Sequence, residues 1–264
     1  MPYRIDVLEP RDDALDRLVQ LGALDVELLD DGQLAAILPD TITADAVARA
    51  LGGARLRVSL AAGRDDGSVW VIRPRAVRIG GVVVAPPGAS APAGALRLTE
   101  STAFGSGLHP TTVLCLEAIE DALAVEIPGS LLDVGTGSGV LSLAALMQGV
   151  PRAVGLDIDA TALKAAAEHA RVNGMEGRLV LVQGGPESIG GAWPLVIANV
   201  LAAPLIEMVP TLIRRVGHRG RLILSGIPKA VAPDVEHAYR RSGLRLVRTT
   251  LRAGWAAVVV DATW

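Results

Sequence analysis

The chain has 264 residues, of which half are hydrophobic and 3% are aromatic, and its formal net charge is −3. This length allows one large domain with or without a small one, and the aliphatic composition favours helices packed on a sheet over an aromatic platform that stacks bases. The slightly acidic charge gives no electrostatic reason to expect direct binding of nucleic acid.

Neither an export signal nor a membrane span is predicted. The first ten residues interleave acids and bases, and they lack the apolar stretch of a signal peptide. Three uncharged stretches reach spanning length, but glycine or proline interrupts each of them. The single cysteine, Cys115, cannot form an internal disulfide, which fits a reducing compartment. We therefore expect a cytoplasmic protein without membrane contact.

The first sixty residues predict a small α+β unit. Its elements alternate as strand, helix, strand, strand, helix and strand, at residues 3–8, 12–21, 24–29, 34–38, 43–51 and 55–60. This order is that of a ferredoxin-like sandwich. Over residues 1–66 there are 7 Arg against 13 Asp and Glu. The excess of acid is either an ordinary solvated surface or a docking face for a basic partner.

A connector follows this unit. Residues 63–94 are rich in glycine and proline, with a short strand pair predicted at 69–72 and 82–84. The predicted organisation is therefore a ferredoxin-like domain over residues 1–62, a linker over 63–97 and a second domain over 98–264.

From residue 98 onward, strands and helices alternate. Apolar strands are predicted at residues 131–134, 153–156, 179–182, 195–198 and 222–224. Helices are predicted at residues 110–123, 139–147, 160–172, 205–216 and 234–242. The last two segments, 244–251 and 255–260, predict an antiparallel hairpin instead of another crossover. The fold class is α/β, a doubly wound and mostly parallel sheet.

The strongest local signal is a strand that runs into a glycine-rich turn and then a helix. Residues 131–139 read Leu-Leu-Asp-Val-Gly-Thr-Gly-Ser-Gly, in which Gly135 and Gly137 let the backbone pass close to a ligand. The following helix begins with free N–H groups. Asp157 ends the next strand, 22 residues after Gly135, where a carboxylate can bind both hydroxyls of a ribose. The spacing predicts an adenosine-type cofactor.

The spacing of the glycines narrows the choice of cofactor. Dinucleotide sites usually read G-x-G-x-x-G, whereas this turn reads G-x-G-x-G and follows Asp133. A carboxylate beside the turn is unfavourable near a pyrophosphate, but it suits a ligand with a positively charged amino group. S-adenosylmethionine has such a group and no phosphate, so it is the predicted cofactor.

Three further segments carry a resemblance to a known family. They are Thr-Ala-Phe-Gly-Ser-Gly-Leu-His-Pro-Thr-Thr at residues 102–112, Gly-Leu-Asp-Ile-Asp at 155–159 and Ile-Ala-Asn-Val-Leu at 197–201. With the glycine turn, they are similar to the bacterial methyltransferases of large-subunit ribosomal protein L11, the PrmA family. The resemblance spans essentially the whole chain, and the run at 102–112 is its most specific part.

The resemblance implies a seven-stranded class I methyltransferase sheet preceded by a small ferredoxin-like domain that recognises the substrate. It implies cofactor contacts from Thr112, Gly135, Asp157 and Asn199, with Asn199 beside the departing methyl group. The implied activity is transfer of methyl groups from S-adenosylmethionine to amines of a basic ribosomal protein, on lysine side chains or on the N-terminal α-amine.

Other interpretations remain open. The scaffold could methylate another protein or a small molecule, or the chain could be a non-catalytic adapter that binds a basic partner. Asn199 could be only a turn residue, and His109, which precedes Pro110, could cap a helix or act in catalysis. Cys115 is expected in the core. No cluster of His, Cys, Asp and Glu has the spacing of metal ligands, so no metal is expected.

Overall fold

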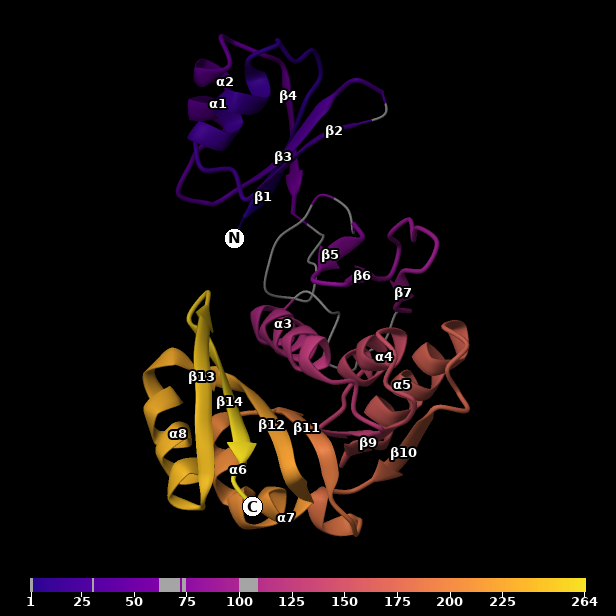
Figure 1. Ribbon diagram of the computed structural model, residues 1–264. Coiled ribbons are helices and arrows are strands. Elements are labelled where there is room, and N and C mark those ends of the chain that lie inside the picture. Colours follow the sequence, from indigo (N-terminus) through magenta and orange to yellow (C-terminus); the bar gives the residue numbers. More distant parts are fainter. Residues whose placement is uncertain (1, 30, 62–71, 73–74, 100–108) are drawn as a thin grey trace. The chain divides into compact units, whose positions relative to one another are not determined.

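The computed structural model describes residues 2–29, 31–61, 72, 75–99 and 109–264 (Figure 1). The chain divides into two compact units, Met1–Arg75 and Ala76–Trp264.

The first unit has the predicted ferredoxin-like order. Its elements are β1 (Tyr3–Val7), α1 (Ala14–Gln20), β2 (Asp25–Leu28), β3 (Leu34–Leu38), α2 (Ala44–Ala50) and β4 (Leu56–Leu60). The strands form an antiparallel sheet in the order β2-β3-β1-β4. The side chain of Thr43 caps α2 by accepting a hydrogen bond from the amide of Ala46, at 3.2 Å. Buried Ile5, Leu18 and Val47 join sheet and helices in one core.

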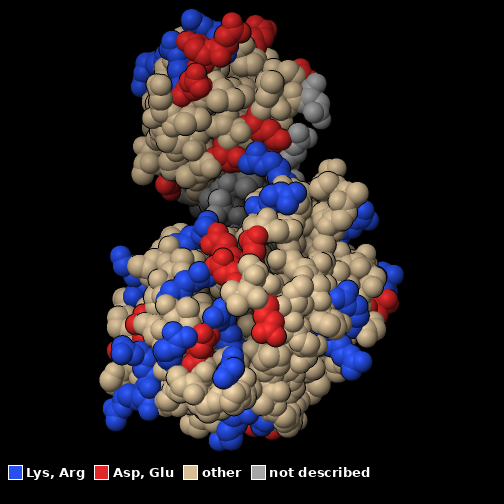
Figure 2. Space-filling model, in the orientation of Figure 1, with Lys and Arg blue, Asp and Glu red and all other residues tan. Residues whose placement is uncertain are grey.

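Acidic side chains group at the top of this unit beside basic ones (Figure 2). Some of the acids are paired within the unit. Arg17 binds Asp13 at 2.7 Å, and Arg4 binds Asp6 at the same distance. The Arg17–Asp13 pair is exposed and contributes little to stability, whereas Asp6 is buried beside Arg4. Both pairs reduce the negative charge that a basic partner would meet, and the acidic docking face remains a prediction.

The second unit is built on the predicted seven-stranded sheet. Its strands are β8 (Leu131–Val134), β9 (Ala153–Asp157), β10 (Leu179–Gln183), β11 (Trp193–Asn199), β12 (Val216–Pro228), β13 (Leu244–Arg252) and β14 (Trp255–Ala262). The order is β10-β9-β8-β11-β12-β14-β13. The first five are parallel, and β14 pairs antiparallel with both β12 and β13. The predicted doubly wound sheet with an antiparallel finish is confirmed.

Helices cover both faces of this sheet (Figure 1). They are α3 (Pro110–Val125), α4 (Val140–Met147), α5 (Ala160–Val172), α6 (Ala202–Glu207), α7 (Val209–Arg215) and α8 (Ala232–Arg241). The central strand β11 supplies alternate side chains to two separate cores. Leu195 and Ile197 join the core under α3 and α4, whereas Val196 and Ala198 join the core under α6, α7 and α8. This two-sided burial explains why β11 is continuously apolar.

The segment predicted as a linker is partly structured. Strands β5 (Val77–Ile79), β6 (Val82–Ala85) and β7 (Leu96–Arg97) form a small sheet within the second unit. The side chains of Val82, Val84 and Leu96 are buried in the core that contains α3 and α4. Apolar residues at these positions are the reason that this stretch packs instead of extending. The predicted strand at 69–72 lies almost entirely outside the described residues.

One predicted helix is wrong. Residues 205–216 do not form a single helix, because α6 ends at Glu207 and α7 starts at Val209. Pro210 at the second position of α7 explains the break. Proline has no N–H to donate to the preceding turn, and its ring collides with the carbonyl four residues earlier in a continuous helix.

Cys115 lies on α3 and is fully buried, as expected. Burial raises the pKa of its thiol, so the side chain stays protonated and acts as a small apolar group. Across the part of the chain that the structure describes, no helix has the length and apolarity needed to cross a membrane. The same residues contain no group of His, Cys, Asp and Glu suited to a metal ion.

Strand β12 contains a bulge near its carboxyl end. Its register with β14 shifts between Leu224 and Ile227, and Gly226 within the bulge has φ of 81°. A Cβ on Gly226 would lie 2.3 Å from the carbonyl oxygen of Val200. The close approach of these two backbone segments therefore requires glycine.

We expect Gly226→Ala to destabilise the protein by about 2 kcal/mol more than Gly174→Ala, because the added methyl overpacks against backbone that cannot rotate away. Gly174 is a matched control: its φ is 67°, but no atom lies within 4 Å of the position that a Cβ would take there. Both variants have the same left-handed strain of ~1–2 kcal/mol. Urea unfolding measures the difference, and equal losses would show that the bulge tolerates a side chain.

Candidate functional site

The candidate site lies where the parallel strands end. Strands β9 and β10 lie on one side of β8, and β11 lies on the other, so the strand order reverses at β8. Ligands of doubly wound folds bind at such a switch point, beyond the carboxyl ends of the strands. A cavity of ≈ 410 Å³ opens there. Its walls are formed by Thr112, Val134, Gly135, Thr136, Gly137, Val140, Leu141, Asp157, Ile158, Gly184, Gly185, Pro186, Asn199, Val200, Leu201, Pro204 and Met208.

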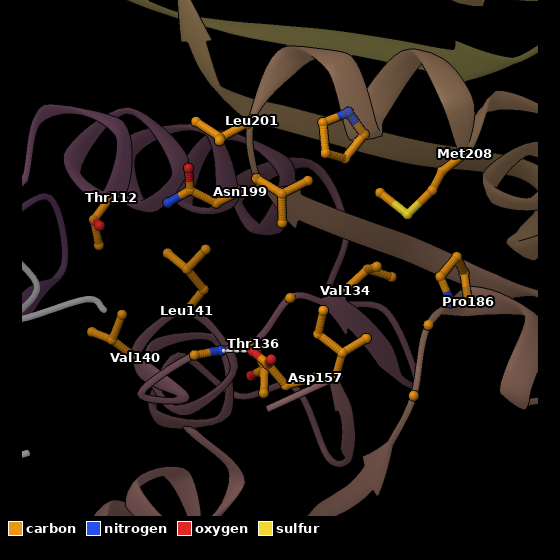
Figure 3. A pocket seen from close by; sticks show the side chains of 17 residues that line it. Thr112, Val134, Thr136, Val140, Leu141, Asp157, Pro186, Asn199, Leu201 and Met208 are labelled. Atoms are coloured by element: carbon orange, nitrogen blue, oxygen red, sulfur yellow. Dashed lines mark hydrogen bonds between the residues drawn. The ribbon is translucent and has the colours of Figure 1, made fainter. Parts of the chain in front are cut away.

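The cavity has distinct ends (Figure 3). Thr112 and Asn199 lie at one end, Pro186 and Met208 lie at the other, and Asp157 lies between them. Asp157 is the only ionisable side chain among the described residues of this wall. The wall thus offers a carboxylate in the middle and two polar side chains at one end, with apolar side chains at both ends and no described Lys or Arg to pair with phosphates.

Asp157 is held in place by the backbone. Its Oδ2 accepts a hydrogen bond from the amide of Gly137 at 2.9 Å, and its Oδ1 accepts one from the amide of Asp159 at 3.0 Å. Each carboxylate oxygen retains further lone pairs. Asp157, the residue predicted to bind a ribose, therefore lines the cavity and is hydrogen-bonded to the glycine turn.

The glycine turn takes the conformation that its sequence predicts. Gly135 has φ of 71°, and a Cβ there would lie 2.4 Å from Cγ1 of Val200. The amides of Gly135 and Thr136 both bind the carbonyl oxygen of Leu156 at 2.8 Å. The turn is therefore anchored to β9 on one side and packed against the loop after β11 on the other.

Asp133 lies beneath the turn, and its side chain is fully buried. It accepts hydrogen bonds at 2.8 Å from the hydroxyls of Thr136 and Ser142. Burial raises the pKa of the carboxyl group, and these two hydrogen bonds oppose the rise. Asp133 is not among the described residues of the cavity wall, so its direct contact with the amino group of a ligand stays a prediction.

Two buried side-chain oxygens of the wall have no hydrogen-bond partner among the described residues. They are the buried Oγ1 of Thr112 and the buried Oδ1 of Asn199. A buried polar group without a partner costs about 1–3 kcal/mol, and groups of this kind gather at binding sites. The two atoms come from α3 and β11, far apart in sequence, and they lie at the same end of the cavity (Figure 3).

A second cavity, of ≈ 230 Å³, adjoins the same end. Asn199, Val200 and Leu201 line both cavities, and the second is completed by His109, Thr111, Gly226 and Trp255. The rings of His109 and Trp255 meet edge to face with their centroids 5.3 Å apart. Asn199 therefore lines both cavities.

His109 caps α3, as one of the two interpretations of the sequence predicted. Its Nδ1 accepts a hydrogen bond from the amide of Thr111 at 3.3 Å and lies 2.8 Å from the Thr111 hydroxyl. The ring also lines the second cavity, so the capping role does not remove it from the site. The rest of the predicted motif, residues 102–108, lies outside the described residues.

Several wall residues were not singled out in the sequence. Ile158 is 78% exposed, which only the structure shows, and the signal that the sequence offered was its position between Asp157 and Asp159. Pro186 and Met208 follow β10 and α6, and no local pattern marks them. Trp255 lies 56 residues after Asn199, and only the antiparallel insertion of β14 brings it near the site.

The chain is similar to several named proteins. A sequence profile described as ribosomal protein L11 methyltransferase (PrmA) matches residues 73–263. The ribosomal protein L11 methyltransferase of Myxococcus xanthus (strain DK1622) is 37% identical over 221 residues, which are 81% of this chain and 75% of that protein. The protein of the same name from Geobacter sulfurreducens is 41% identical over 164 residues, and the match spans about half of that relative, 53%.

The chain is also similar to a solved structure of a protein with a related name. The ribosomal protein L11 methylase from Lactobacillus delbrueckii subsp. bulgaricus superposes with a TM-score of 0.65 at 27% identity. The match covers 72% of this chain and 100% of that structure.

Proposed function

Because the chain belongs to the family of ribosomal protein L11 methyltransferases, we propose that it transfers methyl groups from S-adenosylmethionine to amines of ribosomal protein L11. The amines are lysine side chains, the N-terminal α-amine or both. A ribosomal substrate also favours the cytoplasm as the place of action. The observation that carries the proposal is the position of Asn199 between two adjoining cavities, with its Oδ1 buried and unpaired.

The residues of the larger cavity fit the cofactor. Asp157 would bind the ribose hydroxyls, and Ile158, Pro186 and Met208 would contact the adenine from the apolar end. The opposite end, with the unpaired oxygens of Thr112 and Asn199, would take the methionine portion. The described wall contains no Lys or Arg. This absence avoids repulsion of the positively charged sulfonium, and it leaves a pyrophosphate without a cationic partner.

The smaller cavity suits the side chain that carries the amine. Trp255 and Leu201 offer apolar surface for a methylene chain, and Asn199 lies where that chain would end. Oδ1 of Asn199 can accept a hydrogen bond from the N–H of a neutral amine. This contact would turn the nitrogen lone pair toward the neighbouring cavity.

The proposed chemistry is a direct displacement. When bound, the cofactor supplies a methyl group activated by its attachment to a positively charged sulfur. Asn199 would hold the amine nitrogen in line with this methyl group, so that the new carbon–nitrogen bond would form as the carbon–sulfur bond breaks, and the resulting ammonium would release its proton to water. No oxyanion develops, so the chain's main contribution is to align the nitrogen, the methyl carbon and the sulfur. Fixed alignment of reactants can supply a large part of a rate enhancement.

A methyl-transfer assay tests the proposal. The purified chain is mixed with S-adenosylmethionine that carries a labelled methyl group and, in parallel, with ribosomal protein L11, with an extract of other cell proteins or with small-molecule metabolites. Label on L11 supports the proposal. Label only on other proteins or metabolites would assign the scaffold another substrate, and absence of label in every reaction would favour a non-catalytic adapter.

We expect the fragment 76–264 to fold and to bind S-adenosylhomocysteine as tightly as the full chain, but to methylate L11 poorly. Among the described residues, its core and both cavities are formed by the second unit alone, whereas the proposed recognition surface is in the first. Calorimetry and the labelling assay measure the two properties. Full activity of the fragment on L11 would show that the first unit is not the docking module.

A shorter fragment that begins at residue 95 provides a control for the domain boundary. It lacks β5 and β6 and therefore loses the buried side chains of Ile79, Val82 and Val84. We expect it to unfold at a lower temperature than the fragment 76–264. Equal unfolding temperatures would place residues 76–94 in the linker, as the sequence predicted.

A further inference from the structure

A buried histidine of helix α5 contacts the glycine turn. His169 lies on α5 and is 1% exposed. Its Nδ1 lies 2.7 Å from the carbonyl oxygen of Ser138, which belongs to the glycine turn, and its Nε2 lies 3.3 Å from the carbonyl oxygen of Thr99, just after β7. Neither contact belongs to the walls of the two cavities, and the proposed chemistry does not use them.

The chemistry of these contacts fixes the direction of the hydrogen bonds. A carbonyl oxygen can only accept, so the ring nitrogen is the donor wherever a hydrogen bond forms. The contact of Nδ1 with the carbonyl oxygen of Ser138, at 2.7 Å, is shorter than that of Nε2 with the carbonyl oxygen of Thr99, at 3.3 Å. The main hydrogen bond of His169 is therefore the one to the carbonyl oxygen of Ser138.

This bond completes the anchoring of the turn. The amide of Gly137 is bound by Asp157, and the amide of Gly139 binds the carbonyl oxygen of Thr136 at 2.8 Å. The peptide that joins Ser138 to Gly139 is thus fixed at its N–H from within the turn. At its carbonyl oxygen it is fixed from outside by His169.

Two neighbours of His169 also contact the glycine turn or the strand β7. Ala166, one turn before His169, is fully buried against the glycine turn, where a Cβ on Gly139 would lie 3.1 Å from that of Ala166. Asn173, one turn after His169, accepts from the amide of Arg97 at 2.9 Å and donates to its carbonyl at 2.8 Å. Helix α5 and its C-cap residue Asn173 therefore contact both the glycine turn and the strand β7.

We propose that His169 is a positioning residue for the cofactor: through its Nδ1–H bond to Ser138, it holds the glycine turn in the conformation that binds S-adenosylmethionine. The inference rests on the proposed function. His169 does not touch the cofactor cavity, so its effect is exerted through the backbone of the turn.

Three substitutions separate the two hydrogen bonds. His169→Asn places an amide nitrogen near the position of Nδ1 and keeps the bond to Ser138. His169→Gln places its amide nitrogen near the position of Nε2 and keeps only the contact to Thr99. His169→Leu removes both donors, and His237→Leu, at an exposed position on α8, is the control for the loss of a histidine.

The test measures the affinity of each full-length variant for S-adenosylhomocysteine by calorimetry, together with the ligand-free amide NMR signals of Gly137 and Gly139. We expect His169→Asn to bind like the parent protein, and His169→Gln and His169→Leu to bind about tenfold more weakly, a difference of ~1.4 kcal/mol. The two amide signals should move in the Gln and Leu variants and stay in place in the Asn variant.

The outcomes distinguish this inference from the proposed function. If the Asn and Gln variants bind with equal affinity, the bond to Ser138 does not position the turn, and the inference is overturned even if the Leu variant fails to fold. If the parent protein itself does not bind S-adenosylhomocysteine, the proposed function is overturned, and this inference with it.

Discussion

Replacing Asn199 by alanine should lower the single-turnover rate of amine methylation by about 100-fold, because the nitrogen loses the group that directs its lone pair. The pH dependence should not change. Only the neutral amine can attack, so the rate should rise tenfold per pH unit and level off near the pKa of the substrate amine. That pKa is ~7.7–8.0 for an α-amine and ~10.4 for a lysine in short peptides. Rapid-quench measurements over pH provide both the rate and the inflection.

A variant of His109 is the control for this interpretation. His109→Asn keeps a side chain suited to cap α3 but removes the titrating ring that lines the second cavity. If alignment alone drives the reaction, the variant retains the inflection of the parent protein. A second inflection at lower pH that disappears in His109→Asn would instead identify His109 as a general base, and alignment alone would not account for the mechanism.

Asp157→Ala should weaken the binding of S-adenosylhomocysteine by roughly 30- to 150-fold, which corresponds to ~2–3 kcal/mol for a charge-assisted bidentate contact. The structure adds a second reason for a large effect. The carboxylate also binds the amide of Gly137, so its removal frees part of the glycine turn. Calorimetric titration of the variant measures the loss.

Asp159→Ala is the matched control for this prediction. Asp159 is an exposed carboxylate two residues further along that caps α5 through the amide of Thr161 at 2.8 Å, and it is absent from the cavity wall among the described residues. Its loss should cost ~1 kcal/mol of stability and leave the affinity unchanged. Equal affinities for Asp157→Ala and the parent protein would remove Asp157 from the site.

The sequence predicted the sheet well because its signals are local. Continuous apolar strands such as β11 have no polar face to confuse their assignment, and the turn at Gly135 has the residues that its positive φ requires. Asp157 and Asn199 could be placed at one edge because parallel strands end together. Each of these inferences depends on a few neighbouring residues, and tertiary packing did not oppose them.

The remaining features depend on contacts between segments distant in sequence. Trp255 becomes a cavity residue only when β14 inserts between β12 and β13. Gly226 is one of 29 glycines, and no pattern in the neighbouring sequence predicts its close approach to Val200. His169 resembles any histidine on an amphipathic helix until its ring is seen between two carbonyl oxygens. Such pairings cannot be derived from periodicity or spacing.

The reactivity of the single buried cysteine, Cys115, can report local opening of the second unit. Cys115 is inert while α3 is packed, because only a solvated thiolate reacts with an alkylating agent. The first unit contains no cysteine, so its motions contribute no alkylation. When reclosing outpaces the reaction, the alkylation rate follows the equilibrium between packed and open forms. Mass spectrometry of the alkylated protein can therefore measure how much a bound ligand lowers the population of the open form, with no substitution and no added label.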